Sequence, residues 1–171
     1  MTPLPTVHGR TEFGASRLSC DCDICKAACR YFPGNLLPSD LERLIPEQAD
    51  PYVWAAEHLL ADEGGLLKTR LKPDGSCHWF QGGKCEVWEN SPFGCAFFAC
   101  LKVQSPEEAD RLRTAAKEVV SKALADKTSL YRRLWDYLWN LGRRRTMADT
   151  ALSRERHAQW LRQILPNGTQ H

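Results

Sequence analysis

Long apolar runs are absent from the sequence. No stretch approaches the roughly 18 apolar residues that a membrane-spanning helix needs, so we expect no membrane span. Residues 1–18 also lack a basic start followed by an apolar run, and we therefore expect no secretory signal peptide. Without export, the chain is expected to lie in the reducing cytoplasm.

Signatures of common enzyme classes are missing as well. The chain contains no glycine-rich phosphate loop and no nucleophile elbow. It has no internal repeat and no low-complexity tract. No residue stands out as catalytic, so the sequence leaves open whether the protein is an enzyme.

Cysteine, by contrast, is abundant. The 171 residues are 43% hydrophobic and include six tryptophans, which is enough to build a core without covalent staples. The eight cysteines are therefore more than folding requires. In a reducing compartment, clustered cysteines bind metal more often than they form disulfides.

The cysteines form two groups of four. Thiolates are soft ligands that suit zinc and iron–sulfur clusters and disfavour hard ions such as Mg²⁺. Close spacing lets several thiols turn inward from one loop, where backbone amides can donate hydrogen bonds to the sulfurs. The predicted metal ligands are Cys20, Cys22, Cys25, Cys29, Cys77, Cys85, Cys95 and Cys100.

The charge distribution supports a bound cation. Residues 1–100 contain 9 Lys/Arg and 13 Asp/Glu, a net charge of −4, whereas residues 101–171 contain 14 and 8, a net charge of +6. All eight cysteines fall in the acidic part. Ionising them would bring that part to −12, which only a bound cation makes tolerable in a compact fold.

We divide the chain into a flexible N-terminal arm (1–19), a cysteine-cluster metal-binding domain (20–101) and a C-terminal helical region (102–171) that packs on it. In the cysteine domain we predict three local structures. The residues Ser39 to Glu42 form a capping box that opens a short helix ending at Pro46. Asp50-Pro51 starts a helix that runs through Leu59 and Leu60 and stops at Gly64-Gly65. Residues 77–88 form two short extended arms around a glycine turn.

Three helices are expected after residue 101. Ser105-Pro-Glu-Glu108 is a second capping box, with proline at the first helical position. Apolar residues at helical spacing then predict a helix that begins there, one carrying Leu130 to Leu141, and one from about Met147 to Leu165. The predicted fold class is mostly α with little β: an irregular cysteine-rich metal-binding module followed by a helical hairpin or three-helix segment.

The cysteine pattern resembles a known family. Residues 75–100, GSCHWFQGGKCEVWENSPFGCAFFAC, are similar to the second cysteine stretch of the CxxCxxCC (YkgJ-type) cysteine-cluster family, and Cys22-x-x-Cys25-x-x-x-Cys29 matches its upstream motif. The resemblance covers roughly residues 20–101. It implies a zinc- or iron-chelating domain with eight cysteines, related to a module of flagellin lysine N-methylase.

The chain departs from the family pattern in three places. It has Ala28-Cys29 where the family has adjacent cysteines, and Cys20 supplies the missing thiol. Ser91-Pro92 replaces Arg-Pro, and Ala96 replaces the arginine after the third cysteine. Two cations are therefore absent near the cluster, while the number of thiols is kept.

Cys20 and the histidines have alternative roles to metal binding or its absence. Cys20 fits the family pattern least and is the thiol most open to a role as a buried small hydrophobe. His78, next to Cys77, could replace a thiol in a Cys₃His site, although we favour a supporting or solvent-facing role for it. The remaining histidines do not have the spacing of metal ligands. The Cys-x₂-Cys-x₃-Cys order is the reverse of the spacing in radical S-adenosylmethionine enzymes, so we do not assign the chain to that class. The histidines without a predicted role are His8, His58, His157 and His171.

The basic run Arg143-Arg144-Arg145 could contact nucleic acid. We favour cations at a helix C-terminus and expect no nucleic-acid binding. Trp135 and Trp139, at helical spacing, indicate core or a partner interface. The basic helices are a candidate surface for a protein partner.

The sequence therefore predicts a metal-binding protein that chelates zinc or an iron–sulfur centre through its cysteines. Two alternatives from other classes stay open. One is an iron–sulfur enzyme or electron-transfer protein with methylase-like chemistry. The other is a protein- or RNA-binding module scaffolded by metal. The sequence leaves open which metal is bound and whether the cysteines form one multinuclear centre or two separate sites. It also leaves open the biological role and the oligomeric state.

Overall fold

The structure is a computed structural model that describes residues 6–10, 13–14, 16–19, 29–87, 92–93 and 105–165. The fold is mostly helical, as predicted, with a small sheet at its centre. No helix in these ranges is both long and apolar enough to cross a membrane. The helices are α2 (Pro38–Leu44), α3 (Pro51–His58), α5 (Pro106–Ala125), α6 (Leu130–Leu141) and α7 (Met147–Ile164).

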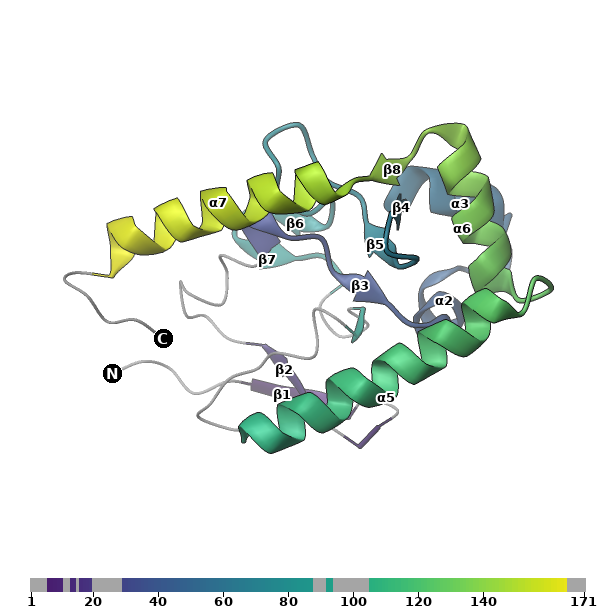
Figure 1. Ribbon diagram of the computed structural model, residues 1–171, viewed down its shortest axis with the longest axis horizontal. Helices are drawn as coiled ribbons and strands as arrows, with labels where there is room; N and C mark the ends of the chain where they lie inside the picture. Colours follow the sequence, from purple (N-terminus) through teal and green to yellow (C-terminus); the bar gives the residue numbers. More distant parts are fainter. Residues whose placement is uncertain are drawn as a thin grey trace.

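Four short strands form the central sheet, in the order β3-β5-β4-β8 (Figure 1). Strands β3, β5 and β4 pair in antiparallel fashion, whereas β8 joins β4 in parallel. Two further pairs are separate antiparallel hairpins, β1 with β2 in the predicted N-terminal arm and β6 with β7 in the cysteine region. The strands are β1 (Thr6–Arg10), β2 (Ser16–Ser19), β3 (Asn35–Leu36), β4 (Leu59–Asp62), β5 (Leu67–Thr69), β6 (Phe80–Gln81), β7 (Lys84–Cys85) and β8 (Arg144–Arg145).

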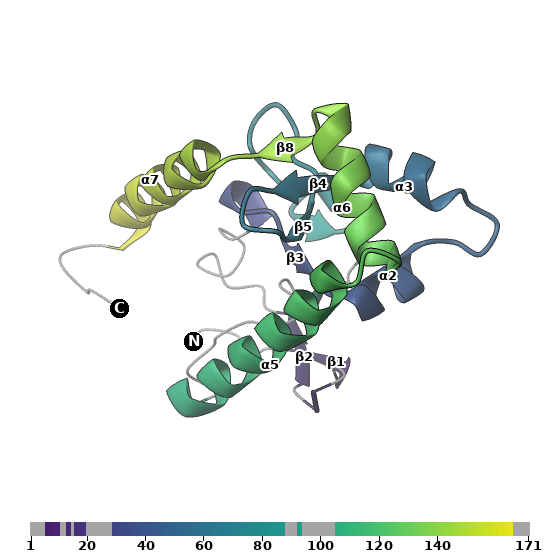
Figure 2. The same ribbon diagram turned by 45° about the vertical axis from the view of Figure 1, so that its right-hand side comes forward.

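The hydrophobic core lies where α6 packs on the sheet. Helix α6 contacts β4 and also packs against α2, α3 and α5 (Figure 2). Its Leu134 and Leu138 are fully buried, as are Leu59 and Leu67 on the sheet. Full burial of each leucine stabilises the fold by roughly 1.5–3 kcal/mol. The core therefore joins residues of the predicted cysteine domain to residues of the C-terminal region. The boundary that we predicted near residue 101 lies outside the described residues and stays a prediction.

Helix α2 begins earlier than the predicted capping box. Its N-cap is Leu37 and its first residue is Pro38, so Ser39 lies inside the helix and does not cap it. Asp40 occupies the third helical position, and its Oδ2 accepts the Leu37 backbone N–H at 2.7 Å. The proline sets the helix start because its fixed φ suits the first helical position.

Helix α3 is shorter than predicted. Asp50 caps it as expected, accepting the N–H groups of Tyr52 and Val53. The helix ends at His58, however, and Leu59-Leu60 begin β4. Pairing with β5 overrides the helical continuation, a tertiary effect that local propensity does not include.

The C-terminal helices begin and end close to the predicted residues. Ser105 caps α5 by accepting the Glu108 N–H at 3.2 Å, and Gly142, with φ +86°, ends α6. Arg144 bonds the Trp139 carbonyl near that end at 2.7 Å, as expected for a cation at a helix C-terminus. The basic run also forms β8, which periodicity did not predict.

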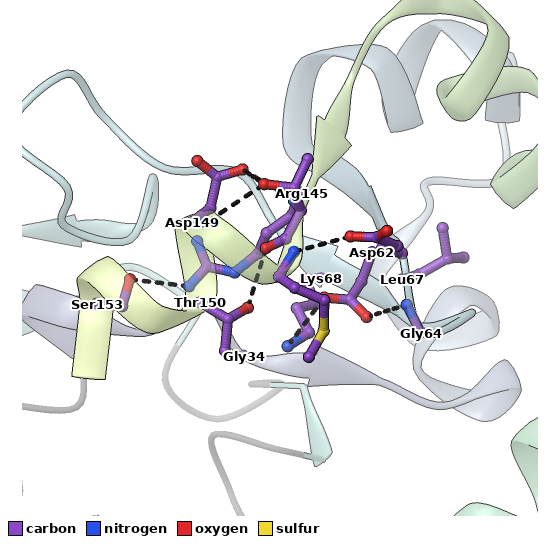
Figure 3. A network of polar contacts seen from close by, with 12 residues as sticks. Gly34, Asp62, Gly64, Leu67, Lys68, Arg145, Asp149, Thr150 and Ser153 are labelled. Carbon is purple, nitrogen blue, oxygen red and sulfur yellow. Dashed lines mark hydrogen bonds and ion pairs between the residues drawn. The ribbon is translucent and has the colours of Figure 1, made fainter. Parts of the chain in front are cut away.

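A buried polar network surrounds β8, the edge strand of the sheet that leads into α7 (Figure 3). Arg145 is only 2% exposed, and its Nη2 donates to Ser153 Oγ of α7 at 2.8 Å. Lys68 Nζ of β5 pairs with Asp62 Oδ2 of β4 at 3.4 Å. Burial lowers the pKa of Lys68, and the charges of Asp62 and Arg145 act in opposite directions on it. Helix α7 leaves this network and lies on the opposite side of the sheet from α5 (Figures 1 and 2).

Candidate metal centre

A tight turn positions Cys77. The Gly75 N–H bonds the Lys72 carbonyl at 2.9 Å, and Gly75 has φ +89°, which favours glycine. Asp74 Oδ1 accepts both the backbone N–H and the hydroxyl of Ser76, at 2.9 and 2.6 Å. The chain then turns back, so that Cys77 and Leu71 form an isolated antiparallel β-bridge beside the end of β5. Local turn chemistry thus places this thiol against the sheet.

Cys29 lies directly beside Cys77. The Cys77 backbone N–H donates to the Cys29 carbonyl at 2.8 Å, which joins the two cysteine groups of the sequence. The Cys77 thiol is buried and lies 3.4 Å from Thr69 Oγ1, which also accepts the Gly34 N–H at 2.9 Å. One cysteine from the front segment and one from the second segment are therefore joined through their backbones, next to the end of β5.

Cys85 reaches the same region through the predicted hairpin. Strands β6 and β7 pair Gln81 with Lys84, and the two-residue loop has Gly82 at φ +53° and Gly83 at φ +80°. These angles define a type I′ turn, the kind that glycine pairs favour in short hairpins. The Val87 backbone N–H hydrogen-bonds the Cys85 sulfur, a contact that favours the thiolate.

Burial keeps the thiols of Cys29 and Cys85 protonated unless a cation is present. Burial first, and then the charges of the neighbouring Cys77 and Cys85, raise the pKa of Cys29 to about 12. Burial likewise raises the pKa of Cys85 to about 11, although the Val87 N–H opposes the shift. A thiolate at either position therefore needs a compensating positive charge close by.

Three of the eight predicted ligands can be placed, and all three lie near one another: Cys29, Cys77 and Cys85. The other five lie outside the described residues: Cys20, Cys22, Cys25, Cys95 and Cys100. Within the described residues, no three His, Cys, Asp or Glu side chains are arranged to hold a metal ion. The three thiols are neighbours that share a region but do not by themselves complete a coordination sphere.

A buried aspartate anchors the start of the last cysteine segment. Asp40 is 1% exposed, and its Oδ2 accepts the Phe93 backbone N–H at 2.9 Å as well as the Leu37 N–H. Its Oδ1 pairs with Arg43. Because Phe93 precedes Cys95 by two residues, Asp40 ties this part of the chain to α2. Nothing in the sequence pattern indicated this contact.

His78 faces another histidine and not the thiols. Its Nε2 lies 3.1 Å from the Nδ1 of His58, the last residue of α3. The sequence offered no signal for His58, since the two histidines belong to different elements and have no metal-ligand spacing. The adjacent Trp79 stacks on His58 with ring centroids 5.6 Å apart.

Comparisons with known proteins add no assignment. The chain matches no family model, and no curated protein or solved structure is significantly similar to it. The geometry of the cysteines is therefore the basis on which a function can be argued.

Proposed function

We propose that the protein binds metal, chelating zinc or an iron–sulfur centre through its eight cysteines. The observation that carries this proposal is the meeting of Cys29, Cys77 and Cys85, which come from separate segments of the chain. A backbone hydrogen bond joins Cys77 to Cys29, and a hairpin with a two-glycine turn carries Cys85. Chance burial of small hydrophobic cysteines does not require such dedicated turns.

The donor set fits soft and borderline metals. Thiolates bind Zn²⁺ and iron–sulfur clusters, and an N–H group aimed at the Cys85 sulfur is the support that such ligands commonly receive. A bound cation would supply the positive charge that the buried thiols lack and would couple metal binding to folding. The sulfurs of the remaining five cysteines would complete the coordination.

The wider predictions follow from this one. The segment 20–101 would be the irregular metal-binding module, in keeping with its resemblance to the CxxCxxCC cysteine-cluster family. A reducing cytoplasm would keep the thiols available for metal. Partner binding would fall to the basic C-terminal helices, and α7 offers exposed Arg154, Arg156 and Arg162 for an acidic protein.

Elemental analysis tests the metal proposal. The protein is purified without oxygen from cells supplied with both iron and zinc, and iron, zinc and sulfide are counted per chain. We expect at least one metal ion per chain, with sulfide if the centre is an iron–sulfur cluster. Cys85→Ser should lower the metal content, whereas Gln81→Ser, an exposed position on the same hairpin, should leave it unchanged.

Two results would overturn the proposal. One is a wild-type chain that contains neither metal after this purification. The other is a Cys85→Ser chain that retains the full wild-type content. Colour separates the two metals, because an iron–sulfur centre absorbs visible light and bleaches with dithionite, whereas zinc is colourless.

A further inference from the structure

We propose that His58 and His78 form a second metal site, separate from the cysteines, for an exchangeable divalent ion of the imidazole-preferring class. Such ions include Ni²⁺, Co²⁺, Cu²⁺ and Zn²⁺. The site consists of two imidazole nitrogens from two elements that face each other across a short gap. Neither nitrogen bonds a thiol among the residues that the structure describes.

The separation of the two nitrogens fits one shared ion. His58 Nδ1 and His78 Nε2 are 3.1 Å apart. Two metal–nitrogen bonds of about 2.05 Å would then meet at an angle of roughly 100°, between square and tetrahedral geometry. Each lone pair would have to turn by about 40° from the line between the two nitrogens to point at the ion. Waters would fill the remaining positions, which makes the ion exchangeable.

The backbone holds the two histidines in register. The Arg70 N–H donates to the His58 carbonyl at 2.8 Å, and the Arg70 carbonyl accepts the His78 N–H at 2.7 Å. One residue of the intervening chain therefore bonds to both. The end of α3 and the segment after Cys77 cannot move apart without breaking these bonds, so the donor pair is preorganised.

Glu57 favours the tautomer that a ligand needs. Its Oε2 lies 3.8 Å from His58 Nε2, on the far side of the ring from His78. A carboxylate there attracts the proton to Nε2 and leaves the Nδ1 lone pair free, the arrangement common behind metal-bound histidines. Before metal binds, His78 Nε2–H donates to His58 Nδ1. When metal binds, that proton moves to His78 Nδ1, and no net proton is released from two neutral rings.

The surroundings allow entry of an ion and keep the His58 ring neutral. The His58 side chain is 23% exposed, so an ion can reach it from solvent. Trp54 and Trp79 lie against the same ring, with centroids 4.9 and 5.6 Å away. Burial lowers the pKa of His58, with His78 adding to the shift, so the ring is neutral near pH 7. The Cys77 thiol, the neighbour of His78 in the sequence, bonds Thr69 Oγ1 and neither imidazole.

Nickel titration of the purified protein, carrying whatever metal it holds on isolation, tests the site. Ni²⁺ bound beside Trp54 and Trp79 should quench tryptophan fluorescence with a stoichiometry of one per chain. His58→Ala and His78→Ala should each weaken binding at least tenfold, and Glu57→Gln should weaken it by a smaller factor. His157→Ala is the matched control, since His157 packs against Phe32 at 5.1 Å, and it should bind like wild type.

Nuclear magnetic resonance of the unmodified chain gives a test that does not depend on variants folding. Substoichiometric Ni²⁺ should broaden the imidazole signals of His58 and His78 before those of His157. Equal broadening of all three, or wild-type nickel affinity in both alanine variants, would overturn the site. The metal carried on isolation is counted separately, so failure of the cysteine proposal would not be mistaken for failure of this one.

Discussion

The hydroxyl of Tyr131 completes the hydrogen bonding of the central sheet. It accepts the Leu67 N–H at 2.8 Å and donates to the Leu36 carbonyl at 3.0 Å. Leu36 and Leu67 are partners in the β3–β5 pairing, so a side chain of α6 is inserted into the ladder. Tyr131 is 1% exposed, and no water can replace it without a rearrangement of the core.

Tyr131→Phe should lower the free energy of unfolding by about 1–3 kcal/mol, because two buried backbone groups lose their partner. Chemical denaturation followed by far-ultraviolet circular dichroism measures the change. The control is Tyr137→Phe on the same helix, whose ring packs on Tyr52, and it should change stability by about 0.5 kcal/mol or less. Equal effects of the two variants would contradict the role of the hydroxyl.

The same residue predicts a dependence on high pH. Burial raises the pKa of Tyr131, and the Leu67 N–H opposes the shift only in part. A tyrosine in the unfolded chain ionises near pH 10, while the folded one stays protonated, so stability is present below pH 10 and is lost as the pH rises above it. Between about pH 10 and 11.5, the melting temperature of Tyr131→Phe should fall less steeply than that of wild type.

Asp40 and Asp50 each accept two backbone N–H groups, but Asp40 is buried and Asp50 is exposed. Their substitution should therefore lower the stability of the fold by different amounts. Asp40→Ala should lower the free energy of unfolding by about 3 kcal/mol, since the carboxylate is buried and its ion pair with Arg43 is lost. Asp50→Ala removes only an exposed N-cap and should cost about 1 kcal/mol. Thermal unfolding ranks the two variants, and a larger cost at Asp50 would contradict the anchoring role of Asp40.

At the scale of elements, the β6–β7 hairpin determines where Cys85 lies. A side chain at Gly83 would meet no neighbour within 4 Å, so substitution there acts through the backbone angle alone. Gly83→Ala should destabilise the turn by roughly 1–2 kcal/mol and lower the metal content of the purified protein. Gly82→Asn, which suits a type I′ turn, should retain both stability and metal. Equal metal contents for the two variants would argue against hairpin control of the site.

The sequence predicted those elements whose signals are local. Ser105 and the glycine pair of the hairpin act on residues within a few positions, and the structure bears out both. Leu59 is predicted to be helical but lies in β4, because its strand partner Thr69 is ten residues away and local signals do not include that contact. The sequence gives the two groups of cysteines, but the hydrogen bond that joins Cys77 to Cys29 is a long-range contact that no spacing predicts. His58 went unrecognised for the same reason.

At the scale of the whole molecule, the C-terminal region completes the sheet. The Arg143 carbonyl accepts the Ala61 N–H at 2.8 Å, and the Arg145 carbonyl accepts the Glu63 N–H at 2.9 Å. Strand β8 therefore covers one edge of β4, an edge that would otherwise be open to pairing with other chains.

Two truncations isolate the contribution of β8. A chain ending at Gly142 lacks both β8 and α7, whereas one ending at Thr146 keeps the strand. The shorter chain should be less stable by roughly 1–3 kcal/mol, from two lost hydrogen bonds, and should form soluble aggregates on size-exclusion chromatography. Identical stability and identical elution would show that β8 is dispensable.

The parallel pairing of β8 with β4 also sets the order in which the protein can mature. During translation, at roughly 5–20 residues per second, β4 is synthesised several seconds before Arg145. Over that interval the nascent thiols belong to a chain whose sheet still lacks its last strand. Closure of the sheet therefore has to wait for residues 143–145, so nascent chains that end before Arg143 should be digested by protease faster than chains that include β8.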